Sequence, residues 1–170
     1  MDKGFNYSMR ELNEQRVDII LEEWRNIAGE DEFSLELEPM FDWCRSHTEQ
    51  KDGDSRAWEL YDPKSDECCA IVEIVDSRRG GLSKLLKLFV TPRFWDMDNN
   101  RKCVIEIYMA TFFEVTKKGI LVGAERVKLY GRTDLMLSIL TSIHARSMEA
   151  SWPKNIKAGI EGRWLTLSFS

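Results

Sequence analysis

The amino-acid sequence predicts an α+β domain in which a mixed central β-sheet is flanked by about four helices. Three observations predict it. Two amphipathic helical stripes lie near the N-terminus, three strand-like segments follow in close succession, and a long apolar helix then precedes further strand-like segments. With 170 residues the chain is long enough for one buried core and short for two. We therefore expect residues 1–170 to form a single domain.

The N-terminal part is expected to contain a short strand and a helix. The strand is placed at residues 5–12, around "FNY". From Asn13 onward, apolar side chains recur at spacings of three and four, which predicts a helix lying on a core, and Gly29 stands where a C-cap is expected. The apolar residues of this stripe are Val17, Ile20, Leu21, Trp24 and Ala28.

A second, shorter helix is predicted by a similar stripe. Its apolar residues are Leu37, Met40, Phe41 and Cys44. The stretch "SHTEQKDGDS" that follows is polar and rich in turn-forming residues. We therefore expect this helix to end by His47 and a surface loop to follow it.

Three strand-like segments come next: "SRAWELY" (55–61), "ECCAIVEIV" (67–75) and "LSKLLKLFVT" (82–91). The intervening stretches "DPKSDE" and "DSRRGGLS" are dense in turn residues. Short polar connections of this kind join antiparallel neighbours, so an antiparallel meander is expected. The adjacent Cys68 and Cys69 are expected on opposite faces of their strand.

The C-terminal half is expected to continue as helix, strand, helix and two strands. A mostly buried helix is predicted at 100–119, ending at Lys117, Lys118 and Gly119. "ERVKLYGRT" follows as a strand, and Thr133 or Asp134 is expected to cap the next helix. The tail from 154 to 170 has two strand-like pieces around Glu161 and Gly162, which indicates a closing hairpin.

Composition and charge narrow the classes of function. A net charge of −5 argues against a nucleic-acid binder that works by broad phosphate neutralisation. No apolar run approaches the roughly 18 residues that span a bilayer, and the N-terminus lacks the apolar region of a signal peptide. The four cysteines show no CxxC pair for a metal site, so they are expected to be free thiols in a reducing cytoplasm, with no metal bound.

The element order, with a helical crossover between the fourth and fifth strands, resembles the fold of the GCN5-related N-acetyltransferases (GNATs). The specific part of the resemblance is "LKLFVTP", which is similar to the family's apolar fourth strand ending in Val-x-Pro, here Val90 and Pro92. The resemblance implies an acyl-CoA-dependent N-acyltransferase. It would use acetyl-CoA and pass the acetyl group to an amine of a small molecule or a protein.

The resemblance also implies where coenzyme A lies. In the family the pantetheine runs beside the fourth strand, which would make Phe89 and Val90 the donors and acceptors of its backbone hydrogen bonds. The diphosphate is held by backbone N–H groups at the start of the next helix. This chain departs from the family's Arg/Gln-x-x-Gly-x-Gly/Ala turn, because "WDMD" stands there and brings two carboxylates.

Polar residues beside this turn are expected to compensate in part. Asn100, Arg101 and Lys102 at the helix start, together with Arg93, are the predicted partners of the diphosphate. The alternative is an ordinary capped helix start that binds nothing.

Candidate catalytic residues are few. The family uses a carboxylate on a central strand to take a proton from the amine, and a tyrosine to protonate the leaving thiolate. Glu73 is the candidate base, because it is set among apolar strand residues and burial makes a carboxylate more basic. Tyr130 is the candidate acid. The alternatives are a solvent-facing strand residue for Glu73 and a packing aromatic for Tyr130.

Two other interpretations stay open. One keeps the fold without catalysis, as a binding or structural module such as a phage virion protein or one that engages a host factor, with exposed tryptophans among Trp95, Trp152 and Trp164 as a docking surface. A protein of that kind would be found in the virion or in the host cytoplasm. In the other, the element order is coincidental and the chain is a different α+β domain. Parallel pairing of the strands on either side of the Val104 helix distinguishes this last case from the GNAT fold.

Overall fold

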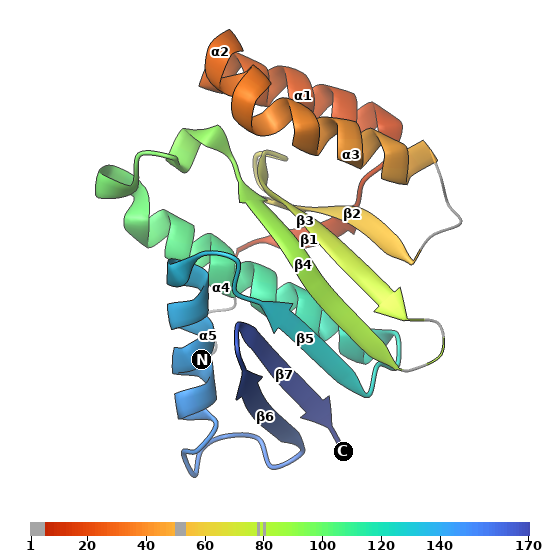
Figure 1. The fold of residues 1–170 in the computed structure, drawn as a ribbon, viewed down its shortest axis with the longest axis vertical. Helices are drawn as coiled ribbons and strands as arrows, with labels where there is room; N and C mark the ends of the chain where they lie inside the picture. Colours follow the sequence, from red (N-terminus) through yellow and green to blue (C-terminus); the bar gives the residue numbers. More distant parts are fainter. Residues whose placement is uncertain (1–5, 50–53, 78, 80) are drawn as a thin grey trace.

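The computed structural model describes residues 6–49, 54–77, 79 and 81–170. Its centre is one seven-stranded mixed sheet with helices on both faces (Figure 1). The strand order is β1-β2-β3-β4-β5-β7-β6, and all neighbours are antiparallel except β4 and β5, which are parallel. The predicted α+β fold and its order of elements are confirmed, and the strands on either side of the Val104 helix are parallel neighbours, as the family resemblance requires.

The first strand and helix form as predicted. Strand β1 (Ser8–Glu11) lies within the expected range, whose first residue falls outside the described part of the chain. Helix α1 (Glu14–Ala28) begins at Asn13, whose side chain accepts a hydrogen bond from the Arg16 N–H at 2.8 Å. It ends at Gly29, which has φ +84° and donates its N–H to the Arg25 carbonyl.

The second helix is longer than predicted. A short α2 (Glu30–Glu32) and a π-helical turn η1 (Phe33–Leu37) lead directly into α3 (Glu38–Glu49). The prediction that the helix ends by His47 is wrong, because the His47 ring packs on Trp43 at 4.6 Å between centroids and Ser46 and Thr48 donate to carbonyls of the preceding turn. Residues 50–53 of the predicted loop lie outside the described residues.

The three central strands form the predicted meander. Strands β2 (Ser55–Tyr61), β3 (Cys68–Ser77) and β4 (Leu82–Val90) pair antiparallel in succession. Cys68 joins the core under α1 and α3, whereas Cys69 joins the core under α4 and α5. The two thiols therefore lie on opposite faces, as predicted.

Helix α4 (Met97–Leu121) carries the chain from β4 to β5 (Arg126–Tyr130), preceded by the single turn η2 (Pro92–Phe94). It extends beyond both predicted ends, and Gly119 does not terminate it. Gly119 is buried, and a Cβ atom there would lie 2.4 Å from Val127 Cγ2. The glycine thus allows α4 to lie directly against β5.

The C-terminal segment closes the sheet. Helix α5 (Asp134–Arg146) is capped by Thr133, whose hydroxyl accepts from the Met136 N–H at 3.2 Å. Strands β6 (Ile156–Glu161) and β7 (Trp164–Phe169) form the predicted hairpin. The later strand β7 enters the sheet beside β5, and β6 forms the edge.

The sheet separates two apolar clusters. One lies beneath α1, η1 and α3, with Trp24, Phe33 and Phe41 fully buried at its centre. The other lies beneath α4 and α5 and includes Ile107 and Leu140. Figure 1 shows α1 and α3 over the β1–β4 half of the sheet, with α5 beside the β5–β7 half. Among the described residues, no helix has the length and apolar composition needed to cross a bilayer.

A buried carboxylate fixes the corner between β1, α1 and β2. Glu59 is fully buried, and its Oε1 accepts from the Nε atoms of both Arg10 and Arg16. Both arginines also contact Asp66, whose pKa is lowered by the hydrogen bond from Arg10. Two guanidinium groups balance the buried carboxylate, so loss of either one leaves its charge less well compensated and makes this corner sensitive to substitution.

Replacement of Gly119 by alanine should destabilise the protein. Alanine is the better helix former, but its Cβ would enter the space of Val127, and overpacking of this kind costs about 1–3 kcal/mol. Urea unfolding followed by circular dichroism measures the loss. Gly159→Ala is the matched control, because nothing lies within 4 Å of a Cβ built there. Equal stability of both variants would show that the close contact of α4 with β5 is absent.

Candidate functional site

Strands β4 and β5 are joined along only part of their length. Their parallel register runs from Leu82–Arg126 to Leu85–Leu129 and then ends. On the other side, β3 remains paired with β4 as far as Ala70–Val90. The last residues of β4 are therefore hydrogen-bonded along one edge and released from β5 along the other.

A bulge changes which backbone groups face the released edge. The β3–β4 register passes from Ile74–Leu85 to Glu73–Lys87 and skips Leu86. Farther along, the Thr91 N–H donates to the Cys69 carbonyl at 2.9 Å, which sets the alternation of the ladder. By that alternation the backbone groups of Phe89 point toward β3, whereas those of Leu88 and Val90 point away from it.

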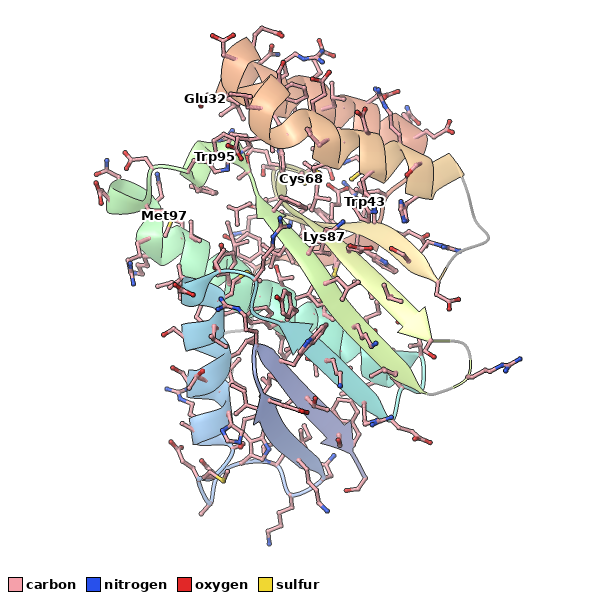
Figure 2. All side chains as sticks on the ribbon, in the orientation of Figure 1. Glu32, Trp43, Cys68, Lys87, Trp95 and Met97 are labelled. Carbon is pink, nitrogen blue, oxygen red and sulfur yellow. The ribbon has the colours of Figure 1, made fainter. Side chains whose placement is uncertain are left out.

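A pocket of about 260 Å³ lies at this released edge. Leu88, Phe89 and Val90 form its β4 wall, and the other walls come from η1, η2 and the first turns of α4. One polar contact already reaches into it, because the Trp95 indole N–H donates to the Val90 carbonyl at 3.2 Å. Figure 2 shows Trp95 just beyond the end of β4 and Met97 at the start of α4. The pocket is narrow, apolar over most of its lining, and edged by backbone amides.

Tyr108 of α4 is the phenol that lines this pocket. Its side chain is largely buried, and burial raises its pKa, an effect that the nearby Thr133 side chain partly opposes. Thr133 is itself held in place as the cap of α5, next to a junction where Arg163 donates to the Gly131 carbonyl and contacts Asp134. From the sequence, Tyr108 is only one residue of the mostly buried helix predicted at 100–119, because its position in the pocket depends on the tertiary fold.

The start of α4 presents backbone N–H groups and one carboxylate. Asp96 is the N-cap residue, yet its side chain makes no hydrogen bond to the helix backbone and instead accepts from the Asn99 amide at 2.6 Å. The Asn100 amide donates to the Asp96 carbonyl oxygen at 3.0 Å. Asp98 adds a second acidic group in the first turn. The first N–H groups of the helix are therefore not occupied by the cap side chain, although negative charge lies beside them.

The basic residues that were predicted to contact the diphosphate differ in their surroundings. Arg101 and Lys102 are exposed on the first turns of α4. Arg93 is engaged by Glu67, with its two terminal nitrogens 2.9 and 3.1 Å from the two carboxylate oxygens. A bidentate pair of this geometry holds the guanidinium in place, so Arg93 must leave Glu67 before it can contact an anion.

Glu73 is buried, but it does not line the pocket. Its carboxylate accepts from the Ser55 hydroxyl at 2.8 Å and lies 3.3 Å from the Lys87 ammonium. Lys87 in turn lies over the Trp43 ring of α3 (Figure 2). The structure therefore places Glu73 on the α3 face of the sheet, within an ion pair. The role predicted for it stays a prediction.

Tyr130 lies at the end of β5 and stacks on Trp164 at 4.8 Å between ring centroids. It is absent from the lining of the pocket. Nearby, the Arg132 guanidinium lies over the Phe89 ring at 5.2 Å and so joins the two strands across their separation. Tyr130 packs as the alternative interpretation expected, close to the opening but outside it, and its catalytic role stays a prediction.

Carboxylates other than Glu73 lie closer to the pocket. Glu36 of the π-helical turn η1 is exposed and lines the pocket mouth. Sequence analysis did not select it, because nothing in the stripe around it indicates that η1 overlies the end of β4. The described residues contain no group of three or more His, Cys, Asp or Glu side chains placed to hold a metal ion.

No protein-family model and no curated protein matches the chain. Solved structures do resemble it. The PaiA N-acetyltransferase from Thermoplasma acidophilum, in complex with coenzyme A, has 13% sequence identity and a TM-score of 0.50, and the match covers 96% of this chain and 99% of that one. The Bacillus subtilis acetyltransferase in complex with CoA has 12% identity and a TM-score of 0.44, and covers 96% and 97% of the two chains.

The protein has the GNAT fold. The match with PaiA extends over nearly the whole of both chains. At this level of identity the likeness shows the fold alone. Activity and substrate must be argued from the residues of this GNAT-fold protein.

Three of the four thiols of the GNAT-fold protein, those of Cys44, Cys68 and Cys69, are not activated nucleophiles. All four cysteines are free. Burial raises the pKa of Cys69 to about 11 and that of Cys44 to about 12, and it raises the pKa of Cys68 well above its usual value. A thiol with a raised pKa carries little thiolate at neutral pH. Covalent catalysis by these three cysteines is therefore disfavoured.

One fast-reacting thiol is expected when the folded protein is treated with an aromatic disulfide reagent at pH 8. Cys103 is only half-buried, on α4, and should react first, while the other three react slowly or only on unfolding. Absorbance of the released thiolate measures the phases, and Cys103→Ser should remove the fast one. A fast phase that persists in this variant would mean that a buried thiol opens to solvent.

Proposed function

We propose that the protein is an acyl-CoA-dependent N-acyltransferase that moves an acyl group, acetyl in the simplest case, to an amine. The observation that supports this most is the released edge of β4. There the backbone groups of Leu88 and Val90 meet a narrow pocket that also contains the Tyr108 side chain. A slender arm with amide groups can extend β4 as an additional strand-like partner, while its thioester end lies near the phenol.

The residues at the pocket fit such an arm under one condition. The pocket volume, about 260 Å³, is below the range of about 300–1,000 Å³ typical of sites that enclose a drug-sized ligand. It therefore suits a narrow chain, with the nucleotide part remaining outside. Trp95 must also release the Val90 carbonyl, which the arm would then bond in its place.

The diphosphate is proposed to lie at the start of α4. The free N–H groups there and the helix dipole favour negative charge, and Asn100, Arg101 and Lys102 are placed to add donors. Asp96 and Asp98 oppose it. The balance of these charges predicts that the diphosphate binds more weakly here than at a glycine-rich turn. Arg93 adds a positive charge only after it leaves Glu67.

The bound thioester would supply an acyl carbon open to attack by an amine and a thiolate leaving group. The amine nitrogen bonds to the acyl carbon, the carbon–sulfur bond breaks, and the sulfur takes a proton. Tyr108 is our proposed donor of that proton, since its side chain lines the pocket and its raised pKa keeps it protonated at neutral pH. The phenol then regains its proton from water.

The acceptor amine loses a proton on the other side of the acyl group. Glu36 is our proposed carboxylate for this step, because it lines the mouth of the pocket and attracts an ammonium group. Glu73 remains the alternative base from sequence analysis, but it would first have to leave Lys87. The acceptor, a small-molecule or protein amine, would approach past η1.

A noncatalytic binding module is the second candidate. Three features favour it. The Trp95 indole already bonds the Val90 carbonyl, Arg93 is paired with Glu67, and carboxylates stand at the start of α4. In that case Trp95, which is exposed, would belong to a docking surface for a protein partner. A virion or host-directed role, and a location in the cytoplasm, remain predictions from the sequence.

Coenzyme A should bind weakly to the wild-type protein and more tightly to Glu67→Gln. This substitution removes the charge that holds Arg93, which becomes free to contact the diphosphate. We expect affinity to rise about three- to tenfold, with a steeper dependence on salt. Calorimetry measures both. Glu161→Gln, which removes an exposed carboxylate in the β6–β7 hairpin, is the matched control and should leave affinity unchanged.

The same titration separates the two candidates. If neither the wild-type protein nor Glu67→Gln shows binding heat or thermal stabilisation at millimolar coenzyme A, the proposed site is absent. Recovery of a defined partner with such a protein would then support the binding module.

Tyr108→Phe should lower kcat for acetyl transfer by about a hundredfold, with little effect on KM, because general-acid assistance is lost. Turnover of acetyl-CoA with a panel of amines measures this. With 4-nitrophenyl acetate, whose leaving group needs no proton, the loss should be much smaller. Tyr130→Phe is the comparison, and a greater loss in that variant would assign the acid to Tyr130 instead.

A further inference from the structure

A second cavity lies over β5 and β7, between α4 and α5. Its volume is about 530 Å³, within the range of small-molecule sites. The walls come from the C-terminal half of α4, from α5, and from the segment that leads into β6. Representative lining residues are Met109, Phe113, Ile120, Ile143, Trp152 and Leu167. We call this cavity the α4–α5 groove.

The groove offers almost no hydrogen-bonding capacity. Besides Lys117, two polar side chains line its walls, and both already donate hydrogen bonds to backbone carbonyls. The Trp152 indole N–H donates to the Ile156 carbonyl at 2.7 Å, and the Thr116 hydroxyl donates to the Phe112 carbonyl at 2.8 Å. A polar ligand would lose its hydration without compensation there. The groove therefore suits hydrocarbon.

Exposed apolar side chains continue the groove onto the surface. Phe113 is 53% exposed, Ile120 48% and Leu121 76%, all on the same half of α4. Apolar side chains gathered in this way on one element mark binding surfaces more often than single exposed residues do. The apolar surface of the groove is therefore exposed to solvent and is not covered by the core.

One basic side chain belongs to the groove itself. Lys117 is the charged residue on its lining, exposed and 3.5 Å from Glu114. The end of α5 and the segment that leads into β6 add exposed groups of both signs, Arg146 and Lys154 as well as Glu149. The charge on the lining is therefore that of the Lys117 ammonium.

We propose that the α4–α5 groove binds an anionic amphiphile, with an unbranched hydrocarbon chain in the groove and a carboxylate at Lys117. The apolar walls account for the chain, and the Lys117 ammonium on the lining accounts for the sign of the head group. A longer partner, such as an amphipathic helix, would need apolar anchors over several turns, whereas the exposed stripe of α4 is short. The proposal does not depend on acyl transfer, because the groove shares no lining residue with the β4 pocket.

The test uses three probes with the same dodecyl chain, each below its critical micelle concentration: dodecanoate, dodecanol and dodecyltrimethylammonium. Dodecanoate should bind in a one-to-one ratio by calorimetry and shift the Trp152 indole resonance, and it should bind more tightly than the other two. Lys117→Gln should weaken dodecanoate about three- to fivefold and leave dodecanol unchanged. Lys64→Gln, at an exposed lysine in the β2–β3 connection, is the matched control and should change neither.

Other results would overturn the proposal. Equal binding of the cationic probe would show that the groove takes any detergent chain. Binding of dodecanoate without a shift of the Trp152 resonance would place it elsewhere. Sedimentation that shows a dimer, lost in Leu121→Glu and unaffected by dodecanoate, would assign the groove to a second copy of the chain.

Discussion

Backbone hydrogen bonds join β4 to β5 only as far as Leu85 and Leu129, and the arrangement of the candidate site follows from where they end. A fully paired strand would have used the amides of Leu88 and Val90 within the sheet. The bulge at Leu86 turns those groups toward the opening, while β3 keeps the strand straight on its other edge. The opening therefore exists because the end of β4 is hydrogen-bonded to β3 along one edge and is no longer paired with β5 along the other.

Three elements keep the opening in shape. Helix α4 lies close to β5 because residue 119 has no side chain, and the same helix carries Tyr108 on the pocket wall. Arg163 ties the β7 end to Gly131 and Asp134, which fixes the cap residue Thr133. Arg132 lies over Phe89 across the opening itself. None of these residues has to take part in chemistry to determine what the pocket admits.

Local sequence signals predicted the elements of this fold well and the site less well. Each of the successful signals is contained in a few adjacent residues. They are the apolar stripes of α1 and α5, the turn residues between β2, β3 and β4, and the Val-x-Pro ending of β4. The roles of Gly119 and Tyr108 are not, because each depends on one distant residue, Val127 and Thr133 respectively. The engagement of Arg93 by Glu67 likewise joins residues 26 positions apart. Charge type alone could not reveal that this cation is already paired.

The position of β7 determines the order in which the chain can complete its fold. This strand, residues 164–169, follows β6 in the chain, yet it lies inside the sheet between β5 and β6. Until it has been synthesised, β5 presents an unpaired edge and Arg163 cannot reach Gly131. During translation the strands before β5 can therefore pair early, whereas the opening beside β4 acquires its final shape only after β7 has been synthesised.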